Sequence, residues 1–360
     1  YTGEDGYFQT VVPAAIGEDD YIAFLPVGVQ NNGTGDVSFI VADPNLTPSS
    51  TPYSVQKGVG EDPELWLWGW PLWSVDSGQD FVVTEDEGSG AARVFDYLRY
   101  AYYTSETRWP DSSRKPLIVW LGMGVSWDCG SCYAPAPHTA FGTTFGGQIW
   151  IDGDSDENYW ADAVIAHELG HWSMIEFGRF PGEAGAHCAG VKTFPGQAWS
   201  EGWASWFSAD VRREPLFVSK YDGTMFWFDI SSREYYGEVP WQRASAYDPD
   251  GLLQKMDENE VAAMLWNMSW EQGIGREPLD RALASDRMTV PPFARGYATH
   301  RWQVGSECKA YDVADTGLSA PVLPDFLDAL VCGGQDSSVI AEATEPYSYY
   351  PYTGRDPLCR

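Results

Sequence analysis

The segment Trp160-Ala-Asp-Ala-Val-Ile-Ala-His-Glu-Leu-Gly-His-Trp172 places two histidines and a glutamate within one predicted helix. We expect this helix to run from about residue 158 to residue 175. Residues four apart share a helix face, so His167 and His171 can point at one metal ion. Glu168 lies one position further round, where it can accept a proton from water but is poorly placed as a ligand. The H-E-x-x-H pattern therefore predicts a zinc site with a carboxylate base beside it.

A catalytic zinc site needs a third protein ligand and an open position for water. The longer motif H-E-x-x-H-x-x-G-x-x-H is excluded because Met174 and Phe177 stand where Gly and His are required. Glu201 opens an apolar, helix-forming stretch that can hold a carboxylate rigidly. His187 and Glu183 are nearer in sequence, but both lie in a Gly-rich loop. We expect Glu201 to be the third ligand, with His187 and Glu183 as the alternatives.

Taken together, His167-Glu168-x-x-His171 and Ser200-Glu201-Gly202-Trp203-Ala204 resemble the gluzincin zinc metallopeptidases, in particular fungalysin- and thermolysin-like enzymes. The resemblance implies an α+β zincin-like catalytic domain, with a small mixed sheet, an H-E-x-x-H helix and a mainly helical lower half. It also implies an edge strand, expected at Gln148–Asp152, that aligns an extended peptide substrate. In such an enzyme Zn2+ is the cofactor and Glu168 is the catalytic base.

Two positions depart from the family pattern. Met256 stands where a fungalysin-like enzyme carries a histidine that stabilises the oxyanion, so another donor is required. The candidates are Tyr235, Tyr236, Tyr297 and His300, among which we favour His300 and Tyr236. Ser205 stands where the family has an acid that supports a zinc-bound histidine. A G-A-M-E-N type exopeptidase segment is also missing, which favours cleavage inside a chain.

We expect three regions along the chain. Residues 1–84 form a β region that is either a small sandwich or an extension of a sheet, residues 85–305 form the metallopeptidase domain, and residues 306–360 form a loop-rich, disulfide-bearing segment. Within the first region, Trp66, Trp68, Trp70 and Trp73 mostly alternate, as expected for one strand face that packs on a neighbour or stacks on sugars. Other expected elements are helices at 89–102, 201–212 and 257–270 and a strand at 116–121.

The loop before the zinc helix carries alternating acidic residues, Asp152, Asp154 and Asp156. This spacing resembles the first half of a calcium loop, although Glu157 and Ala163 stand where Gly and Glu are needed. The alternative is an acidic turn that caps the following helix and favours its dipole. We keep Ca2+ as a second candidate ligand on these three carboxylates.

Composition restricts the partners. With 22 Lys+Arg against 52 Asp+Glu, the formal charge of the 360-residue chain is -30, which disfavours binding to nucleic acid or anionic membranes. No apolar run reaches the roughly 18 to 20 residues of a membrane span. Six cysteines favour an exported protein, secreted or periplasmic, and we expect a monomer. The expected disulfides are Cys129–Cys132, Cys308–Cys332 and Cys188–Cys359.

The sequence thus predicts a zinc-dependent metalloendopeptidase that acts on proteins or peptides. The alternative is a zinc protein directed at glycoproteins or cell wall, either a glycan-recognising protease or a non-catalytic binding module with aromatic platforms. Glu168 argues against the binding module, because a structural zinc site does not need an unliganded base.

Overall fold

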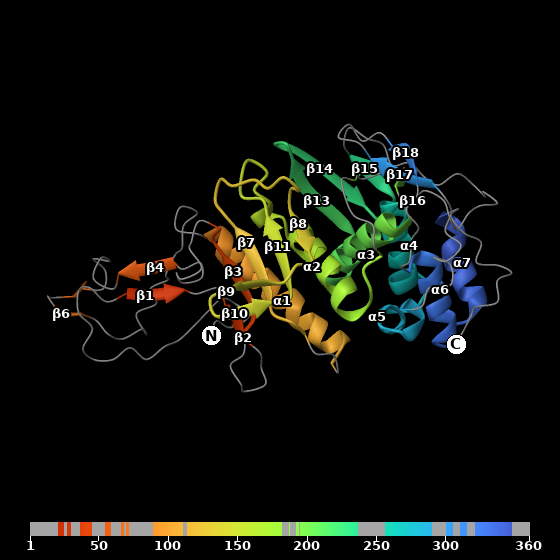
Figure 1. The fold of residues 1–360 in the computed structure, drawn as a ribbon, viewed down its shortest axis with the longest axis horizontal. Coiled ribbons are helices and arrows are strands. Elements are labelled where there is room, and N and C mark those ends of the chain that lie inside the picture. Colours follow the sequence, from red (N-terminus) through yellow and green to blue (C-terminus); the bar gives the residue numbers. More distant parts are fainter. Residues whose placement is uncertain are drawn as a thin grey trace.

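The fold combines helices with small β-sheets (Figure 1). The computed structural model describes residues 21–24, 27–29, 37–44, 55–58, 66–67, 70–71, 89–110, 114–181, 187, 192–193, 195–236, 256–289, 300–304, 310–314 and 321–347. Within these ranges the chain has the α+β character that the sequence predicts, with the largest sheet on one side and most of the later helices on the other.

The largest sheet has five strands in the order β2-β3-β7-β11-β8. Their bounds are β2 Val27–Val29, β3 Val37–Ala42, β7 Leu117–Leu121, β8 Cys132–Ala134 and β11 Gly147–Ile151. The three middle strands are parallel, and the outer two run antiparallel to their neighbours. Strands β2 and β3 belong to the region expected at 1–84, so they extend the sheet of the following region.

The expectation that Gln148–Asp152 forms the edge strand is wrong. Strand β11 lies between β7 and β8, and its residue Trp150 pairs with Cys132 of β8. The edge on this side is therefore β8, which returns antiparallel to β11 after the Cys-bearing loop. A three-residue strand between Gly-rich segments gives too short a pattern to be recognised in the sequence.

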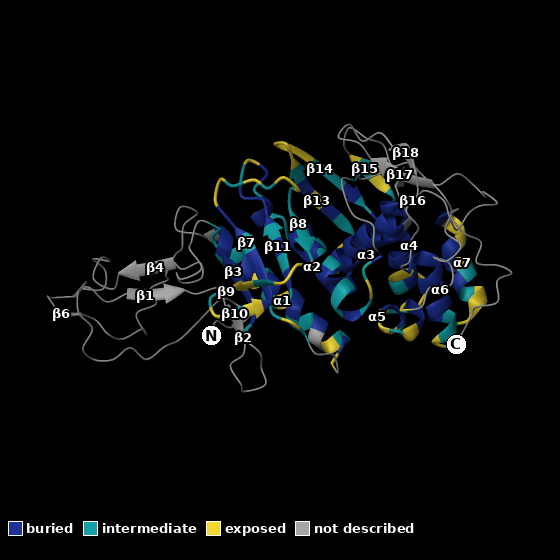
Figure 2. Cartoon of the chain, in the orientation of Figure 1, coloured by how far each residue is buried: buried dark blue, intermediate teal, exposed yellow. Residues whose placement is uncertain are grey.

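The two faces of the sheet are covered by different elements. One face packs against α1, Ser89–Arg108, and α2, Asp162–Phe177. The opposite face packs against a hairpin of β9, His138–Ala140, and β10, Thr143–Phe145. Alternate residues of each strand contribute to the two cores, as the period of a strand requires. Figure 2 shows that the sheet and α2 are largely buried.

Three helices follow one another across the centre of the molecule (Figure 1): α2, then α3, Pro195–Arg212, then α4, Glu258–Trp266. Helix α3 starts six residues before the expected 201, with a proline in its first position, where its missing N–H is not needed. Glu201 is therefore in the second turn of the helix. Helix α4 continues into a π-helical turn, η6, Asn267–Glu271.

Two glycines allow these helices to approach closely. A Cβ atom on Gly170 of α2 would lie 2.5 Å from the Cα of Ala204 on α3. A Cβ atom on Gly202 of α3 would lie 2.4 Å from the Cβ of Val261 on α4. Both distances are shorter than packed atoms tolerate. Each glycine is adjacent in sequence to a residue of the predicted zinc site, so the close packing also fixes that site.

After α3 the chain forms a three-stranded sheet, with β13 Leu216–Tyr221, β14 Thr224–Asp229 and β15 Glu234–Tyr236. The first two strands are joined by Asp222-Gly223, both with positive φ, as in a tight hairpin turn. The inner face of this sheet packs toward α2: the Phe217 ring stands edge-on to His167, with ring centroids 6.0 Å apart.

The segment expected to be loop-rich, residues 306–360, contains two α-helices among its described residues. It includes α6, Leu323–Cys332, and α7, Ser337–Thr344, next to α5, Arg276–Leu283. Buried Arg287 pairs with Asp325 and Asp328 of α6. Short 3-10 turns are η4 Asn158–Trp160, η7 Asp286–Met288 and η9 Glu345–Tyr347.

Four further strand pairs are small. They are β1 Tyr21–Phe24 with β4 Val55–Gly58, β5 Trp66–Leu67 with β6 Trp70–Pro71, β12 Lys192–Thr193 with β16 Met256–Asp257, and β17 His300–Val304 with β18 Ala310–Ala314. The single Trp-rich strand expected around 66–73 is instead a hairpin, in which Leu67 pairs with Trp70.

The predicted Cys129–Cys132 disulfide is present, with Cα atoms 6.0 Å apart. Cys332 is also disulfide-bonded. The other predicted pairings involve Cys188, Cys308 and Cys359, which lie outside the described residues.

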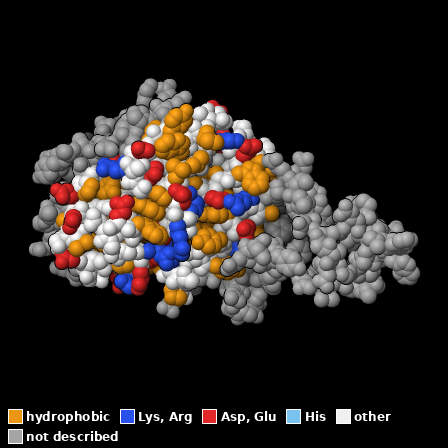
Figure 3. All heavy atoms as spheres, turned by 180° about the vertical axis from the view of Figure 1, so that it is seen from behind, with side chains coloured by type: hydrophobic (Ala, Val, Ile, Leu, Met, Phe, Trp, Pro, Cys, Tyr) orange, Lys and Arg blue, Asp and Glu red, His pale blue; other side chains and the backbone are white. Residues whose placement is uncertain are grey.

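The described surface fits the composition. Figure 3 shows acidic side chains scattered among basic and apolar ones on one face rather than gathered into a single patch. Across the described ranges, we find no helix with the length and apolar character needed to cross a bilayer.

Candidate metal centre

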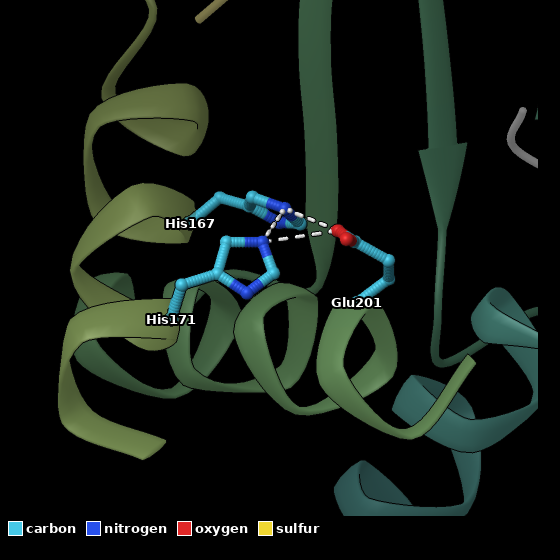
Figure 4. A group of neighbouring side chains, drawn as sticks. All are labelled: His167, His171 and Glu201. Atoms are coloured by element: carbon cyan, nitrogen blue, oxygen red, sulfur yellow. Dashed lines mark hydrogen bonds and ion pairs between the residues drawn. The ribbon is translucent and has the colours of Figure 1, made fainter. Parts of the chain in front are cut away.

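His167, His171 and Glu201 meet at one point, as the sequence predicts. The two imidazoles project from α2 toward the carboxylate of α3 (Figure 4). The Nε2 atoms of the histidines are 3.1 Å apart, and they lie 3.1 Å (His167) and 3.0 Å (His171) from Oε2 of Glu201. Three ligand atoms in a nearly equilateral triangle are an arrangement that a single ion can occupy.

The donor set fits zinc. In a tetrahedral site with bonds of about 2.0 to 2.1 Å, the ligand atoms are about 3.3 to 3.4 Å apart. The observed separations of 3.0 to 3.1 Å differ from this by only a few tenths of an ångström. Two neutral imidazoles and one carboxylate would leave the ion with a net charge of about +1, which suits a Lewis acid better than a thiolate set does.

Glu168 is buried beside this cluster and is not one of the three ligands. Its side chain is only 4% exposed, and Oε2 has no hydrogen-bond partner. Burial raises the pKa of Glu168 above the usual range of a glutamate, although His167 and His171 act in the opposite direction. A buried carboxylate with a free oxygen and a raised pKa has the properties of a general base.

The charges of the cluster are coupled. Burial favours the neutral form of Glu201, but His171 and His187 outweigh it and hold the pKa of this carboxyl well below its usual range. For His171, burial acts against the charged form, and the Glu201 carboxylate raises its pKa instead. Glu201 is thus held as an anion, which is the form that binds a cation.

His187 also reaches the cluster, although it comes from the Gly-rich segment between α2 and α3. Its Nε2 lies 3.4 Å from Oε2 of Glu201, and its Nδ1 lies 2.8 Å from Oε2 of Glu258 on α4. Burial acts against the charged form of His187, but the two carboxylates raise its pKa to about 10. The ligand atoms that all lie within 4.8 Å of one another come from His167, His171 and Glu201, and His187 does not contribute to this group.

The other predicted site residues are not brought to the cluster by any contact within the described ranges. Tyr236 is 63% exposed, and its ring stacks on Trp227, on the face of the sheet opposite to Phe217. The side chain of His300 and the whole of Glu183 lie outside the described residues. The assignment of His300 or Tyr236 as oxyanion donor stays a prediction.

Asp152, Asp154 and Asp156 form a second group whose oxygens lie within 4.8 Å of one another. Here the oxygens already accept backbone N–H groups. Asp152 accepts from Trp127, Asp154 from Asp156, and Asp156 from the two turn residues of the β13–β14 hairpin, Asp222 and Gly223. These carboxylates do not cap α2, whose N-cap residue makes no side-chain hydrogen bond. Calcium binding by this loop stays a prediction.

Comparison with models of protein families and with curated protein sequences gave no match to this chain.

Proposed function

We propose that this protein is a zinc-dependent metalloendopeptidase of the gluzincin type, with a zincin-like catalytic domain. The observation that carries the proposal is the pairing of two features on one short stretch of α2. His167 and His171 converge with Glu201 on one point, and Glu168 holds an unpaired carboxylate oxygen beside them. A structural metal site would not require that buried base.

His167, His171 and Glu201 would hold a zinc ion, which would supply a Lewis acid for the substrate carbonyl and would lower the pKa of water to about 7. Glu168 accepts the proton of the attacking water and returns it to the leaving amine, as its raised pKa suits. His187 donates a hydrogen bond from Nε2 to the carbonyl oxygen of the substrate, with Glu258 orienting its ring through Nδ1. In this role His187 replaces the donor that Met256 cannot provide.

The edge strand β8 supports an extended peptide substrate. It packs beside α2, and within the described ranges it pairs along one edge only, with β11. A peptide added to the other edge would gain backbone hydrogen bonds without regard to its sequence. Such binding fits cleavage inside a chain. We retain secretion and a monomeric state as parts of the proposal, on the grounds of composition alone.

The glycan-directed alternative depends on the Trp-rich segment. Its strands, β5 and β6, form a hairpin whose side chains lie outside the described residues. It remains an alternative and gains no support from the site, since Glu168 is positioned for proton transfer.

The proposal is tested by replacing Glu168 with Gln and digesting a peptide library with the purified protein. We expect Glu168→Gln to keep one equivalent of zinc and to lower turnover about 10²- to 10⁴-fold, because only proton transfer is removed. Glu176→Gln is the matched control: it lies on the same helix, where its carboxylate accepts the backbone N–H of Lys115. Wild-type cleavage by Glu168→Gln would refute the mechanism.

A further inference from the structure

The outer nitrogens of both histidines contact serine hydroxyls. Ser205 Oγ lies 3.2 Å from Nδ1 of His167, and Ser200 Oγ lies 3.1 Å from Nδ1 of His171. The Nε2 atoms of the same rings face Glu201. In each imidazole, Nε2 therefore faces the carboxylate of the cluster, while Nδ1 contacts a serine hydroxyl.

All three partners of the histidine pair come from one helix. Ser200, Glu201 and Ser205 lie within little more than one turn of α3, and each is less than 8% exposed. Residues 201 and 205 are four apart and share a face of the helix. Helix α3 thus supplies the third ligand and the hydrogen-bond partners of the other two ligands. Its position against α2 is fixed by the close contact between Gly170 and Ala204.

This arrangement has a chemical consequence. A histidine that binds a metal through Nε2 carries its proton on Nδ1 and donates it to a neighbouring acceptor, which sets the ring orientation. A carboxylate acceptor would also push charge onto the ring and strengthen its hold on the metal. A serine oxygen is neutral, so it orients the ring without adding that charge.

We propose that Ser200 and Ser205 are positioning residues of the metal centre, which hold both imidazoles with Nε2 directed at the ion and leave the ion more positive than carboxylate partners would. This inference rests on the proposed zinc site. Ser208 provides the contrast on the same helix: its hydroxyl donates to the backbone oxygen of Ala163 and accepts from Nε of Arg212, so its partners are not the histidines of the cluster.

The test is the zinc affinity of the full chain, measured by competition with a chromophoric chelator. We expect Ser205→Ala and Ser200→Ala each to weaken zinc binding about 10- to 100-fold. Ser205→Thr keeps the hydroxyl and should restore affinity, whereas Ser205→Asp should bind zinc more tightly than wild type. Ser208→Ala, the matched control, loses a buried hydroxyl of the same kind and should keep wild-type affinity.

A second readout separates ring orientation from general stability. With Co2+ in place of zinc, the visible absorption bands should shift in Ser205→Ala and not in Ser208→Ala, because only the first variant changes the geometry of a ligand. Wild-type affinity and spectrum in both Ser200→Ala and Ser205→Ala would overturn the inference while leaving the zinc site intact. Absence of zinc binding in the wild type would instead refute the proposed function. Should an alanine variant fail to fold, the Thr and Asp variants give the same comparison.

Discussion

Among the described residues, two clusters each bring three potential ligand atoms within 4.8 Å of one another, and they differ in what those atoms already contact. At the His167–His171–Glu201 cluster, the two Nε2 atoms and the carboxylate oxygen face one another. At the Asp152–Asp154–Asp156 cluster, the oxygens accept backbone N–H groups from the surrounding loops. Proximity of acidic groups is therefore a weaker sign of a metal than ligand atoms that converge on one point.

The difference follows from the elements that carry the residues. Two packed helices, α2 and α3, hold the first cluster, and Gly170 at their contact with Ala204 lets them approach closely. The second cluster lies in a loop, where a carboxylate is needed to satisfy backbone donors that have no place in a helix or strand. We therefore expect the helical cluster to hold metal and the loop cluster to stabilise the fold.

The largest effect is expected from the third ligand. Glu201→Ala should reduce bound zinc well below one equivalent, measured by metal analysis after gel filtration, because only two ligands remain. His187→Ala is the matched comparison and should keep its zinc but cleave peptides more slowly, since His187 lies outside the ligand group. Full zinc in Glu201→Ala with loss in His187→Ala would assign the third ligand to His187.

A substitution in the acidic loop should change the stability of the fold rather than the zinc content. Asp156→Ala removes the buried carboxylate that accepts the backbone N–H groups of Asp222 and Gly223 in the β13–β14 turn, so we expect a loss of about 1 to 3 kcal/mol in the free energy of unfolding. Zinc content should not change. Asp154→Ala is the control, because among the described residues its carboxylate accepts a single backbone N–H, that of Asp156 two residues away.

The same pair of variants tests the calcium hypothesis. Saturating calcium should change the melting temperature of the wild type and of Asp156→Ala by equal, small amounts. Calcium could instead raise the melting temperature of the wild type strongly and leave that of Asp156→Ala unchanged. The loop would then be a cation site, and the distinction between the two clusters would fail.

The smallest effect is expected at the Cys129–Cys132 disulfide, which joins the preceding loop to the first residue of edge strand β8. Its closed loop is so short that the double Cys129→Ser/Cys132→Ser variant should lose at most about 2 kcal/mol in urea unfolding, with zinc unchanged. Thiol titration of the denatured, unreduced wild type should find no free cysteine. Six free thiols would instead refute the argument for export.

The sequence was most informative where a helix carries the chemistry. Spacing alone predicts that His167 and His171 share a face, and the helix-forming context of Glu201 distinguishes it from Glu183. His187 could not be placed, because a Gly-rich segment has no periodicity to indicate where a side chain points. Its contact with Glu258 depends on the packing of α4 against α3, which is set by Gly202.

The wrong predictions of strands also come from segments too short to show a clear pattern. The edge strand β8 has only three residues, and the Trp-rich stretch forms two strands of two residues each, Trp66–Leu67 and Trp70–Pro71, that pair with one another. The β13–β14 hairpin, in contrast, was predictable: Asp222-Gly223 lies between two apolar runs and is the usual signal for a tight turn.

The central claim is tested most directly by chelation and repletion of peptide cleavage. The wild-type protein is assayed on a peptide library, treated with 1,10-phenanthroline, dialysed, and assayed again as zinc is titrated back. The account predicts cleavage at internal bonds, loss after chelation, and recovery that saturates at one equivalent of zinc per chain. Cleavage that survives removal of all bound metal, or a fully zinc-loaded protein that cleaves no peptide, would contradict it.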